Sequence, residues 1–221
     1  MDQDTLISIL AHELRSSLWG ADGFLRLIKE DLSSQLDHDV QEYLEKAHQS
    51  LKEASSFVSR LIDLNRVVNT PVTIHEIDIA LMAEEVWDKI VHEFREKGVS
   101  FRCQRMKPVF SDPNLLRLIL NELLSNARKA VQFTTRPRVQ FSCSRTKEGK
   151  HIYEIRDNGI GFDMSKVGRL FEPCFKFHPR VKFPGSGLGL CITKESLQLL
   201  EGTISASSEP GQGSVFCFTL P

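Results

Sequence analysis

The sequence predicts two domains, an all-α helical hairpin followed by an α/β sandwich. Two long segments near the start each carry an apolar residue every three or four positions, with a short polar connection between them, and this pattern predicts the hairpin. Beyond Pro71, short alternating segments are interleaved with helical ones, which predicts the second domain. We expect the hairpin at 1–67, a linker and first strand region at 68–75, and the second domain at 76–221.

The composition is ordinary for a globular protein and excludes several function classes. The 221 residues carry a formal net charge of −1, with 41% hydrophobic and 26% charged residues, so nothing indicates binding to nucleic acid or to an anionic membrane. The five cysteines show no C-x-x-C spacing, and no apolar run is long enough to span a bilayer. We expect a cytoplasmic location, with a sensor or a membrane-tethering region upstream of this stretch.

The first helix is expected at 2–32 and the second from Asp39, as its N-cap, to residue 67, joined by a connection at 33–38. One hairpin cannot bury both apolar stripes, so we expect two copies to form a four-helix bundle, which makes the protein a homodimer. Packing of the hairpin on the second domain is the alternative. The stripe of the first helix comprises Leu6, Leu10, Leu14, Leu18, Ala21, Leu25, Ile28 and Leu32.

The second domain is expected to contain one mixed sheet with helices on one face. Pro71 and the residues before it break the helical pattern, Gly98 stops a helix, and Asp112 with Pro113 offers a helix start. The expected strands are 72–79, 99–105, 138–144, 151–156, 203–208 and 214–220. The expected helices are 80–97, 113–133 and 188–200, and 157–187 is a long loop of the kind that is usually functional.

The stretch Ile9–Leu18 places a histidine away from the apolar stripe of its helix. His12 points to the opposite side from Leu10 and Leu14, Glu13 adjoins it, and Ser16 lies one turn later on the same face. An exposed imidazole beside a carboxylate can act as a nucleophile with a base at hand. An ordinary surface histidine would give the same local pattern.

Three polar side chains share one face of the helix expected at 113–133. Glu122, Asn126 and Lys129 follow the i, i+4, i+7 spacing. A carboxylate and an amide offer oxygen ligands to magnesium, and an ammonium can neutralise a phosphate. Alone, the same spacing also fits the solvated face of a surface helix.

Three glycine motifs follow. Asp157 begins a D-x-G-x-G turn with Gly159 and Gly161, in which the carboxylate can accept a hydrogen bond from an exocyclic amine such as that of adenine. The next, Gly185-Ser186-Gly187-Leu188-Gly189, opens a helix and leaves amides free to bind phosphate, without the G-K-[ST] ending of a P-loop. The last, Gly211-Gln212-Gly213-Ser214, is expected to be a simple turn.

In this order and spacing the motifs resemble the catalytic core of sensor histidine kinases, whose ATP-binding domain has the Bergerat-type fold of the gyrase-type ATPases. Ile9–Leu18 resembles the family's phosphoacceptor box, His-Glu-Leu-Arg-Thr-Pro-Leu, and Leu170–Lys176 resembles the phenylalanine box of its ATP lid. The resemblance covers the whole chain. It implies autophosphorylation of a histidine from ATP and Mg²⁺, transfer to an aspartate on a response-regulator receiver domain, and phosphatase activity as well.

The resemblance also implies residue roles. His12 would be the phosphoacceptor, Glu13 its general base, Asn126 a magnesium ligand, Lys129 a phosphate contact and Asp157 the adenine partner. The nucleotide pocket would be shaped by Gly159, Gly161, Gly185, Gly187, Leu188 and Gly189.

The chain departs from the family pattern at three places. Ser16 and Ser17 replace threonine and proline, which keeps a hydroxyl for a phosphatase role but removes the usual helix irregularity after the histidine. Glu122 replaces a frequent asparagine, so it is either a catalytic base or a magnesium contact. Lys176 replaces a lid arginine and keeps its charge without the bidentate fork.

Two other classes of function stay open on the sequence alone. The first is a non-catalytic phosphotransfer or scaffold protein with a weak or inactive ATP site. The second is an ATPase or a serine kinase on the same nucleotide fold. The motifs at Asn126 and Asp157 argue against the first, and the His12–Glu13 pair argues against the second.

Overall fold

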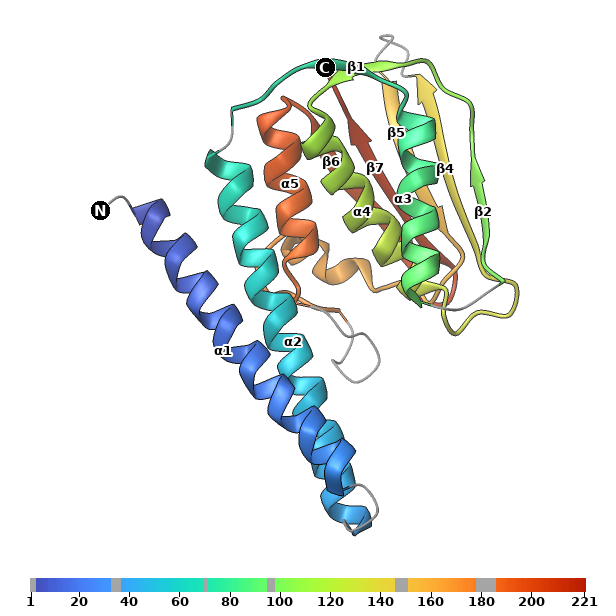
Figure 1. The fold of residues 1–221 in the computed structure, drawn as a ribbon. Helices are drawn as coiled ribbons and strands as arrows, with labels where there is room; N and C mark the ends of the chain where they lie inside the picture. Colours follow the sequence, from blue (N-terminus) through green and yellow to red (C-terminus); the bar gives the residue numbers. More distant parts are fainter. Residues whose placement is uncertain (1–2, 33–36, 70, 95–97, 146–150, 178–185) are drawn as a thin grey trace. The chain divides into compact units, whose positions relative to one another are not determined.

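The computed structural model describes residues 3–32, 37–69, 71–94, 98–145, 151–177 and 186–221 (Figure 1). The chain forms two compact units, one built on Met1–Asn69 and one that holds Thr70–Phe177 and Gly189–Pro221. An all-α region followed by an α/β domain is the fold class that the sequence predicts, and this prediction is confirmed. None of the helices in the described ranges is both long and apolar enough to cross a membrane.

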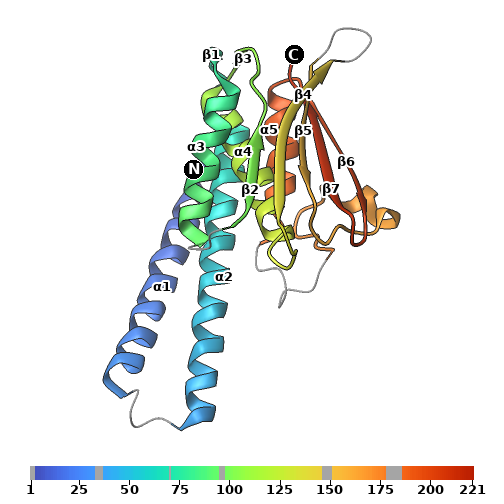
Figure 2. The ribbon, with the colours of Figure 1, turned by 90° about the vertical axis from the view of Figure 1, so that its right-hand side faces the viewer.

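Two long helices, α1 (Gln3–Leu32) and α2 (His38–Asn69), make the expected hairpin and lie side by side (Figures 1 and 2). The expectation that Asp39 caps the second helix is wrong. The carboxylate of Asp37 accepts a hydrogen bond from the backbone N–H of Val40 at 2.8 Å, which is the N-cap interaction three residues ahead. The ion pair between Lys29 of α1 and Glu45 of α2, at 2.9 Å, lies on the solvated side.

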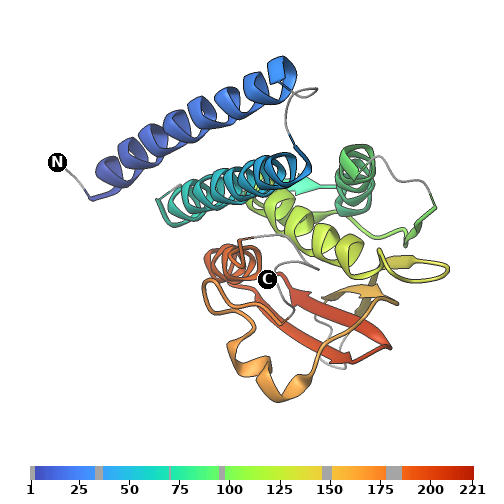
Figure 3. The ribbon, with the colours of Figure 1, turned by 90° about the horizontal axis from the view of Figure 1, so that it is seen from below.

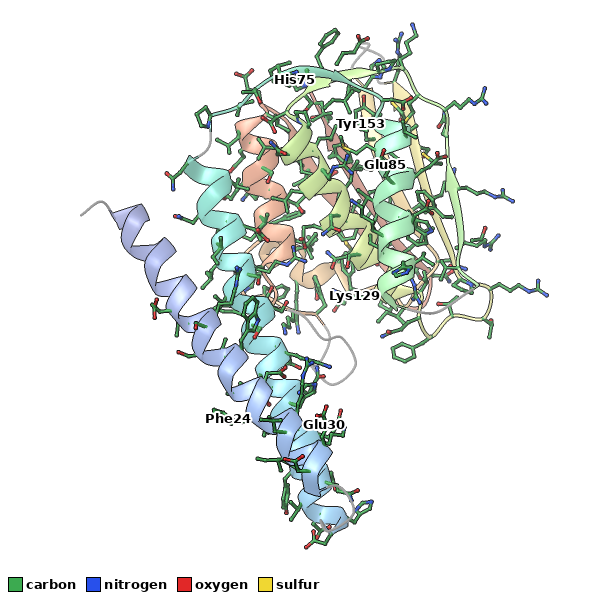
Figure 4. All side chains as sticks on the ribbon, in the orientation of Figure 1. Phe24, Glu30, His75, Glu85, Lys129 and Tyr153 are labelled. Carbon is green, nitrogen blue, oxygen red and sulfur yellow. The ribbon has the colours of Figure 1, made fainter. Side chains whose placement is uncertain are left out.

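The contact with α2 covers only part of the apolar stripe of α1. Leu14 and Ile28 keep 53% and 38% of their surface exposed, and Ala21 between them is also exposed. Leu14, Ala21 and Ile28 follow a seven-residue repeat, which is the spacing of a helix–helix seam. Phe24 is 69% exposed and projects from the side of α1 that faces away from α2 (Figure 4). One hairpin therefore leaves apolar surface uncovered.

The second unit is built on a five-stranded sheet with the order β2-β4-β5-β7-β6. Its strands are β2 (Ser100–Cys103), β4 (Arg138–Arg145), β5 (His151–Asp157), β6 (Thr203–Glu209) and β7 (Gly213–Thr219). Only β2 and β4 are parallel, so the sheet is mixed as expected.

Three helices cover one face of this sheet (Figure 2). They are α3 (Ile79–Phe94), α4 (Pro113–Ala130) and α5 (Gly189–Leu199), and α4 packs against both of the others. The core contains Leu120, Leu123 and Leu124 of α4, each fully buried. It also contains Tyr153 and Phe218 of the sheet, whose ring centroids lie 5.1 Å apart. Seen from below, the helix layer and the sheet separate clearly (Figure 3).

Some expected boundaries are wrong. The strand expected at 72–79 is only β1 (His75–Ile77), because the Asp78 carboxylate accepts from the N–H of Leu81 and starts α3 at Ile79. The strand expected at 99–105 is limited to Ser100–Cys103. The helix expected to reach Phe133 ends at Ala130 and continues as a turn.

Two short elements were not expected. Strand β3 (Val109–Ser111) pairs with β1 in a separate two-stranded sheet, and the 3₁₀ helix η1 (Met164–Arg169) lies within the long loop, beside β6 (Figure 3). Asp112 connects the small sheet to α4, because its carboxylate accepts from the N–H groups of Asn114 and Leu115 and from the N–H and hydroxyl of Thr73. This fixes the start of the helix that carries Glu122, Asn126 and Lys129.

Candidate functional site

Asp157 ends β5 as a buried carboxylate. It is 4% exposed, and its Oδ1 accepts a hydrogen bond from the N–H of Gly159 at 2.8 Å. Burial raises the pKa of Asp157 to about 6, although its hydrogen bonds from Gly159 and Ser214 act in the opposite direction. A buried carboxylate with a strongly perturbed pKa at a strand end is a frequent feature of binding sites. This one can accept a hydrogen bond from a ligand N–H.

The turn at 211–214 belongs to the same site, which the sequence reasoning missed. Ser214 pairs with Asp157 across β7 and β5, and both its backbone N–H and its hydroxyl donate to the Asp157 carboxylate. The N–H of Gly211 donates to the carbonyl of Ile160 at 2.7 Å. The signal was the serine directly after the G-x-G turn, but only the strand pairing places it beside Asp157.

The two loops pack so closely that Gly161 cannot carry a side chain. It has φ of +60°, and a Cβ there would overlap the carbonyl oxygen of Glu209. The N–H of Ile160 also donates to the carbonyl of Ala130 at the end of α4, at 3.1 Å. The loop after β5 is therefore held between the C-terminus of α4 and the turn before β7.

On α4, Glu122 is buried at 4% exposure, while Asn126 and Lys129 are half-buried. Lys129 lies near the C-terminal end of the helix (Figure 4). The carboxylate of Glu122 reaches the first residue of α5, because a Cβ on Gly189 would overlap Glu122 Oε2. The structure thus brings together Glu122 and the end of the third motif, where a helix N-terminus favours negative charge.

Aromatic stacking holds the end of the segment Leu170–Lys176, which resembles the phenylalanine box. Phe162 stacks on Phe177 with 4.5 Å between ring centroids, and Phe175 meets Phe177 edge-on at 5.1 Å. The guanidinium of Arg169 lies 4.8 Å from the centroid of Phe175. The half-buried Lys176 lies between Phe175 and Phe177 in the chain, and Phe177 stacks on Phe162 of the loop that begins at Asp157.

Residues 186–188 lead directly into α5. Gly187 has φ of +75°, Leu188 is 2% exposed, and the N–H of Leu188 lies 3.2 Å from the hydroxyl of Ser186. Gly185 lies outside the described residues, so its predicted role stays a prediction.

On the hairpin, Glu13 and Ser16 are exposed. His12 lies within α1, but its side chain is outside what the structure describes. The Ser17 hydroxyl donates to the carbonyl of Glu13 at 3.0 Å, and α1 continues through this position without a break. Whether the loss of proline removes the irregularity after the histidine stays a prediction.

The predicted magnesium ligands fit a metal that shares its shell with a nucleotide. Among the described residues, no group of three or more His, Cys, Asp or Glu side chains could hold a metal ion. Mg²⁺ usually takes one or two carboxylates and completes its shell with phosphate oxygens and water. Glu122 and Asn126, one turn apart on α4, supply that kind of partial set.

Two family models match separate parts of the chain and together cover most of it. Residues 111–221 match the histidine kinase-, DNA gyrase B- and HSP90-like ATPase model, and residues 2–70 match the His Kinase A phospho-acceptor domain. The chain belongs to the histidine kinase family. It holds a histidine kinase catalytic core, with the acceptor domain preceding the ATPase domain.

Curated relatives of this histidine kinase core are sensor proteins. It is 28% identical over 229 residues to the aerobic respiration control sensor protein ArcB of Escherichia coli, which covers 99% of this chain and 28% of ArcB. It is 28% identical over 225 residues to the autoinducer 2 sensor kinase/phosphatase LuxQ of Vibrio vulnificus, covering 96% of this chain and 26% of LuxQ. The chain thus spans little more than a quarter of the length of these relatives.

Solved structures share the fold of this histidine kinase core. Full-length ShkA in complex with AMPPNP matches with a TM-score of 0.71 at 24% identity, covering all of this chain and 46% of ShkA. The histidine kinase AdeS of Acinetobacter baumannii matches with a TM-score of 0.62 at 21% identity, covering 95% of this chain and 96% of AdeS.

Proposed function

We propose that this chain binds ATP, phosphorylates itself on His12 and passes the phosphoryl group to an aspartate of a response-regulator receiver domain. The observation that carries the proposal is the buried carboxylate of Asp157, positioned by Gly159 and Ser214. An ATP-competent site needs such a fixed acceptor for the adenine amine. The membership in the histidine kinase family and the AMPPNP complex of ShkA support the same conclusion.

Asp157 accepts the hydrogen bond from the adenine amine, and Gly159 and Gly161 let the backbone approach the base. Gly185, Gly187, Leu188 and Gly189 form the phosphate-binding entry to α5, where free amides favour negative charge. Lys129 and Lys176 add positive charge that neutralises phosphate oxygens.

Asn126 and Glu122 would hold Mg²⁺, which when bound neutralises charge on the phosphates. The buried carboxylate of Glu122 could serve in one of two roles, as a magnesium contact or as a catalytic base. In either role, the position of the Glu122 carboxylate requires a residue without a side chain at position 189.

The reaction on the hairpin uses adjacent residues of α1. Glu13 removes the proton from one ring nitrogen of His12, and the other nitrogen attacks the γ-phosphorus in line as ADP leaves. The protein acts mainly by positioning these groups and by neutralising charge. In the phosphatase direction, Ser16 and Glu13 position a water molecule for attack on the phosphorylated regulator. The name of LuxQ, a sensor kinase/phosphatase, supports this second activity.

The proposed partners are a second copy of the chain and a response regulator. The exposed seam of Leu14, Ala21 and Ile28 supports a homodimer through the hairpins. An upstream sensor region is part of the proposal, because the sensor relatives are far longer than this chain.

The test is incubation with radiolabelled ATP and magnesium, comparing wild type with His12→Gln. Label that is acid-labile, alkali-stable and absent from the variant is expected. Asn126→Asp and Asp157→Asn should lose label together with nucleotide binding, whereas His12→Gln should keep binding. Acid-stable label would instead identify a serine kinase, and nucleotide hydrolysis without label would identify an ATPase. Absence of both label and nucleotide binding would favour the scaffold alternative.

A further inference from the structure

An open hollow of about 300 Å³ lies at the end of the sheet where β5 begins. Gln104, Arg105 and Lys107 line it from the segment after β2. The sheet contributes Cys143, Arg145 and His151. None of the described residues that line it is acidic.

The hollow is distant from the nucleotide site. His151 begins β5 and Asp157 ends it, and at about 3.4 Å per residue the two are separated by ~20 Å along the strand. The cluster therefore does not belong to the proposed ATP site. Neither Phe162 nor any described glycine of the three motifs lines it.

The charged residues that the structure describes in the lining of the hollow are all basic. Arg105, Lys107 and Arg145 are exposed, and within the described ranges no ion pair to a carboxylate is seen for any of the three. Three cations gathered around one concavity repel each other unless an anion joins them. Arginine also offers a planar fork that matches the oxygens of a phosphate.

Hydrogen bonds make the rest of the lining compatible with an anion. Arg145 Nε donates to His151 Nε2 at 3.1 Å, so a neutral ring carries its proton on Nδ1, 3.5 Å from Cys143 Sγ. Neither ring nitrogen then offers a lone pair to a metal ion. Burial raises the pKa of the Cys143 thiol, which keeps it uncharged. The side-chain carbonyl of Gln104 accepts from the Cys143 N–H at 3.2 Å, which leaves its NH₂ group as donor.

We propose that this hollow binds a small phosphate-bearing anion, with Arg105, Lys107 and Arg145 as its charged ligands. The inference is independent of the proposed kinase activity, since no residue of the hollow takes part in it. Cys143 lies in the lining and serves as a built-in reporter of occupancy.

The test uses the whole chain without magnesium and pyrophosphate as the probe. Alkylation of Cys143 by iodoacetamide is followed by peptide mass spectrometry, with the exposed Cys174 as the internal reference. We expect pyrophosphate to slow alkylation of Cys143 by about tenfold at ~10 times its Kd and to leave Cys174 unchanged. Sodium chloride at equal ionic strength should not protect Cys143.

The variant Arg105→Ala/Lys107→Ala should raise the pyrophosphate Kd by at least about tenfold, because it removes two charge-assisted contacts. Arg102→Ala is the matched control, since Arg102 is exposed on β2 but does not line the hollow. Phosphorus NMR line broadening of pyrophosphate gives the same comparison without relying on thiol reactivity. Pyrophosphate that binds at the nucleotide site should broaden the signal equally in wild type, in the double variant and in Arg102→Ala. Equal broadening in the double variant and in wild type, or equal protection by sodium chloride, would overturn the proposal.

Discussion

The carboxylate of Glu122 occupies the space that a side chain at Gly189 would need, since a Cβ on Gly189 would overlap Glu122 Oε2. Glu122 is buried on α4, and Gly189 is the first residue of α5. The two helices that we propose hold magnesium and phosphate therefore approach each other closely at this point. Any added atom at this point must move the carboxylate or the helix.

Gly189→Ala should accordingly lower both stability and nucleotide affinity. Overpacking a closed site typically costs about 1–3 kcal/mol of the free energy of unfolding, and displacement of Glu122 should weaken binding of Mg-ATP. Urea unfolding and calorimetric titration measure the two effects. Gly168→Ala is the control, because a Cβ there meets nothing within 4 Å. A variant that binds and unfolds as wild type does would show that Glu122 moves away without cost.

Nucleotide binding should depend on pH through Asp157. Its pKa is raised from 3.8 to about 6 by burial, so ionisation of this group makes the free energy of unfolding fall as pH rises between those values. The adenine amine favours the ionised carboxylate, so affinity should increase as pH rises through about 6. Calorimetric titration of wild type in buffers of different ionisation enthalpy should detect proton release near pH 6. Proton uptake on binding would contradict the expected coupling.

Ser214 should affect the same ionisation of Asp157. Its N–H and hydroxyl both lower the pKa of Asp157, so Ser214→Ala should move the pH midpoint of nucleotide binding upward and weaken binding at pH 6.5. A lost hydrogen bond to a charged group costs about 1.5–3 kcal/mol. The effect of Ser214→Ala should be smaller than the loss of both bonds, because the backbone N–H still donates to Asp157. Ser207→Ala, an exposed position on β6, should leave the midpoint unchanged. An unchanged midpoint in Ser214→Ala would remove Ser214 from the site.

Elements with a repeating apolar pattern could be predicted from the sequence. Features that depend on a single contact could not. The stripes of α1 and α2 repeat many times, so periodicity was enough to predict them. The start of α3 depends on the capping carboxylate of Asp78, which outweighs the strand-like alternation before it. Ser214 looked like a turn residue because its partner, Asp157, lies on another strand and is brought beside it only by the pairing of β5 with β7.

Ser17→Pro should restore the helix irregularity that the family pattern has after the phosphoacceptor. Proline removes the backbone donor and the hydroxyl that bonds the Glu13 carbonyl, at a cost of about 3 kcal/mol in a helix interior. If bending of α1 limits approach of the nucleotide, the initial rate of autophosphorylation should rise while helix content falls. Ser17→Ala removes only the hydroxyl bond and should change neither strongly. A slower reaction in Ser17→Pro would show that the continuous helix is the active form.

The exposed seam on α1 predicts how the dimer can be separated. Ile28 is 38% exposed in the single hairpin, one heptad after Ala21 and two after Leu14, so a bundle of two hairpins would bury it. Ile28→Arg would place an unpaired charge in that core at a cost of about 3–5 kcal/mol, which corresponds to roughly a thousandfold higher dissociation constant. Sedimentation equilibrium should show a monomer for Ile28→Arg. Glu30→Arg, which adds the same side chain at an exposed position of the same helix (Figure 4), should stay dimeric. Because Asp157, Asn126 and Glu122 of the proposed nucleotide site belong to the other unit, the monomer should still bind ATP, and a dimeric Ile28→Arg protein would exclude this seam as the interface.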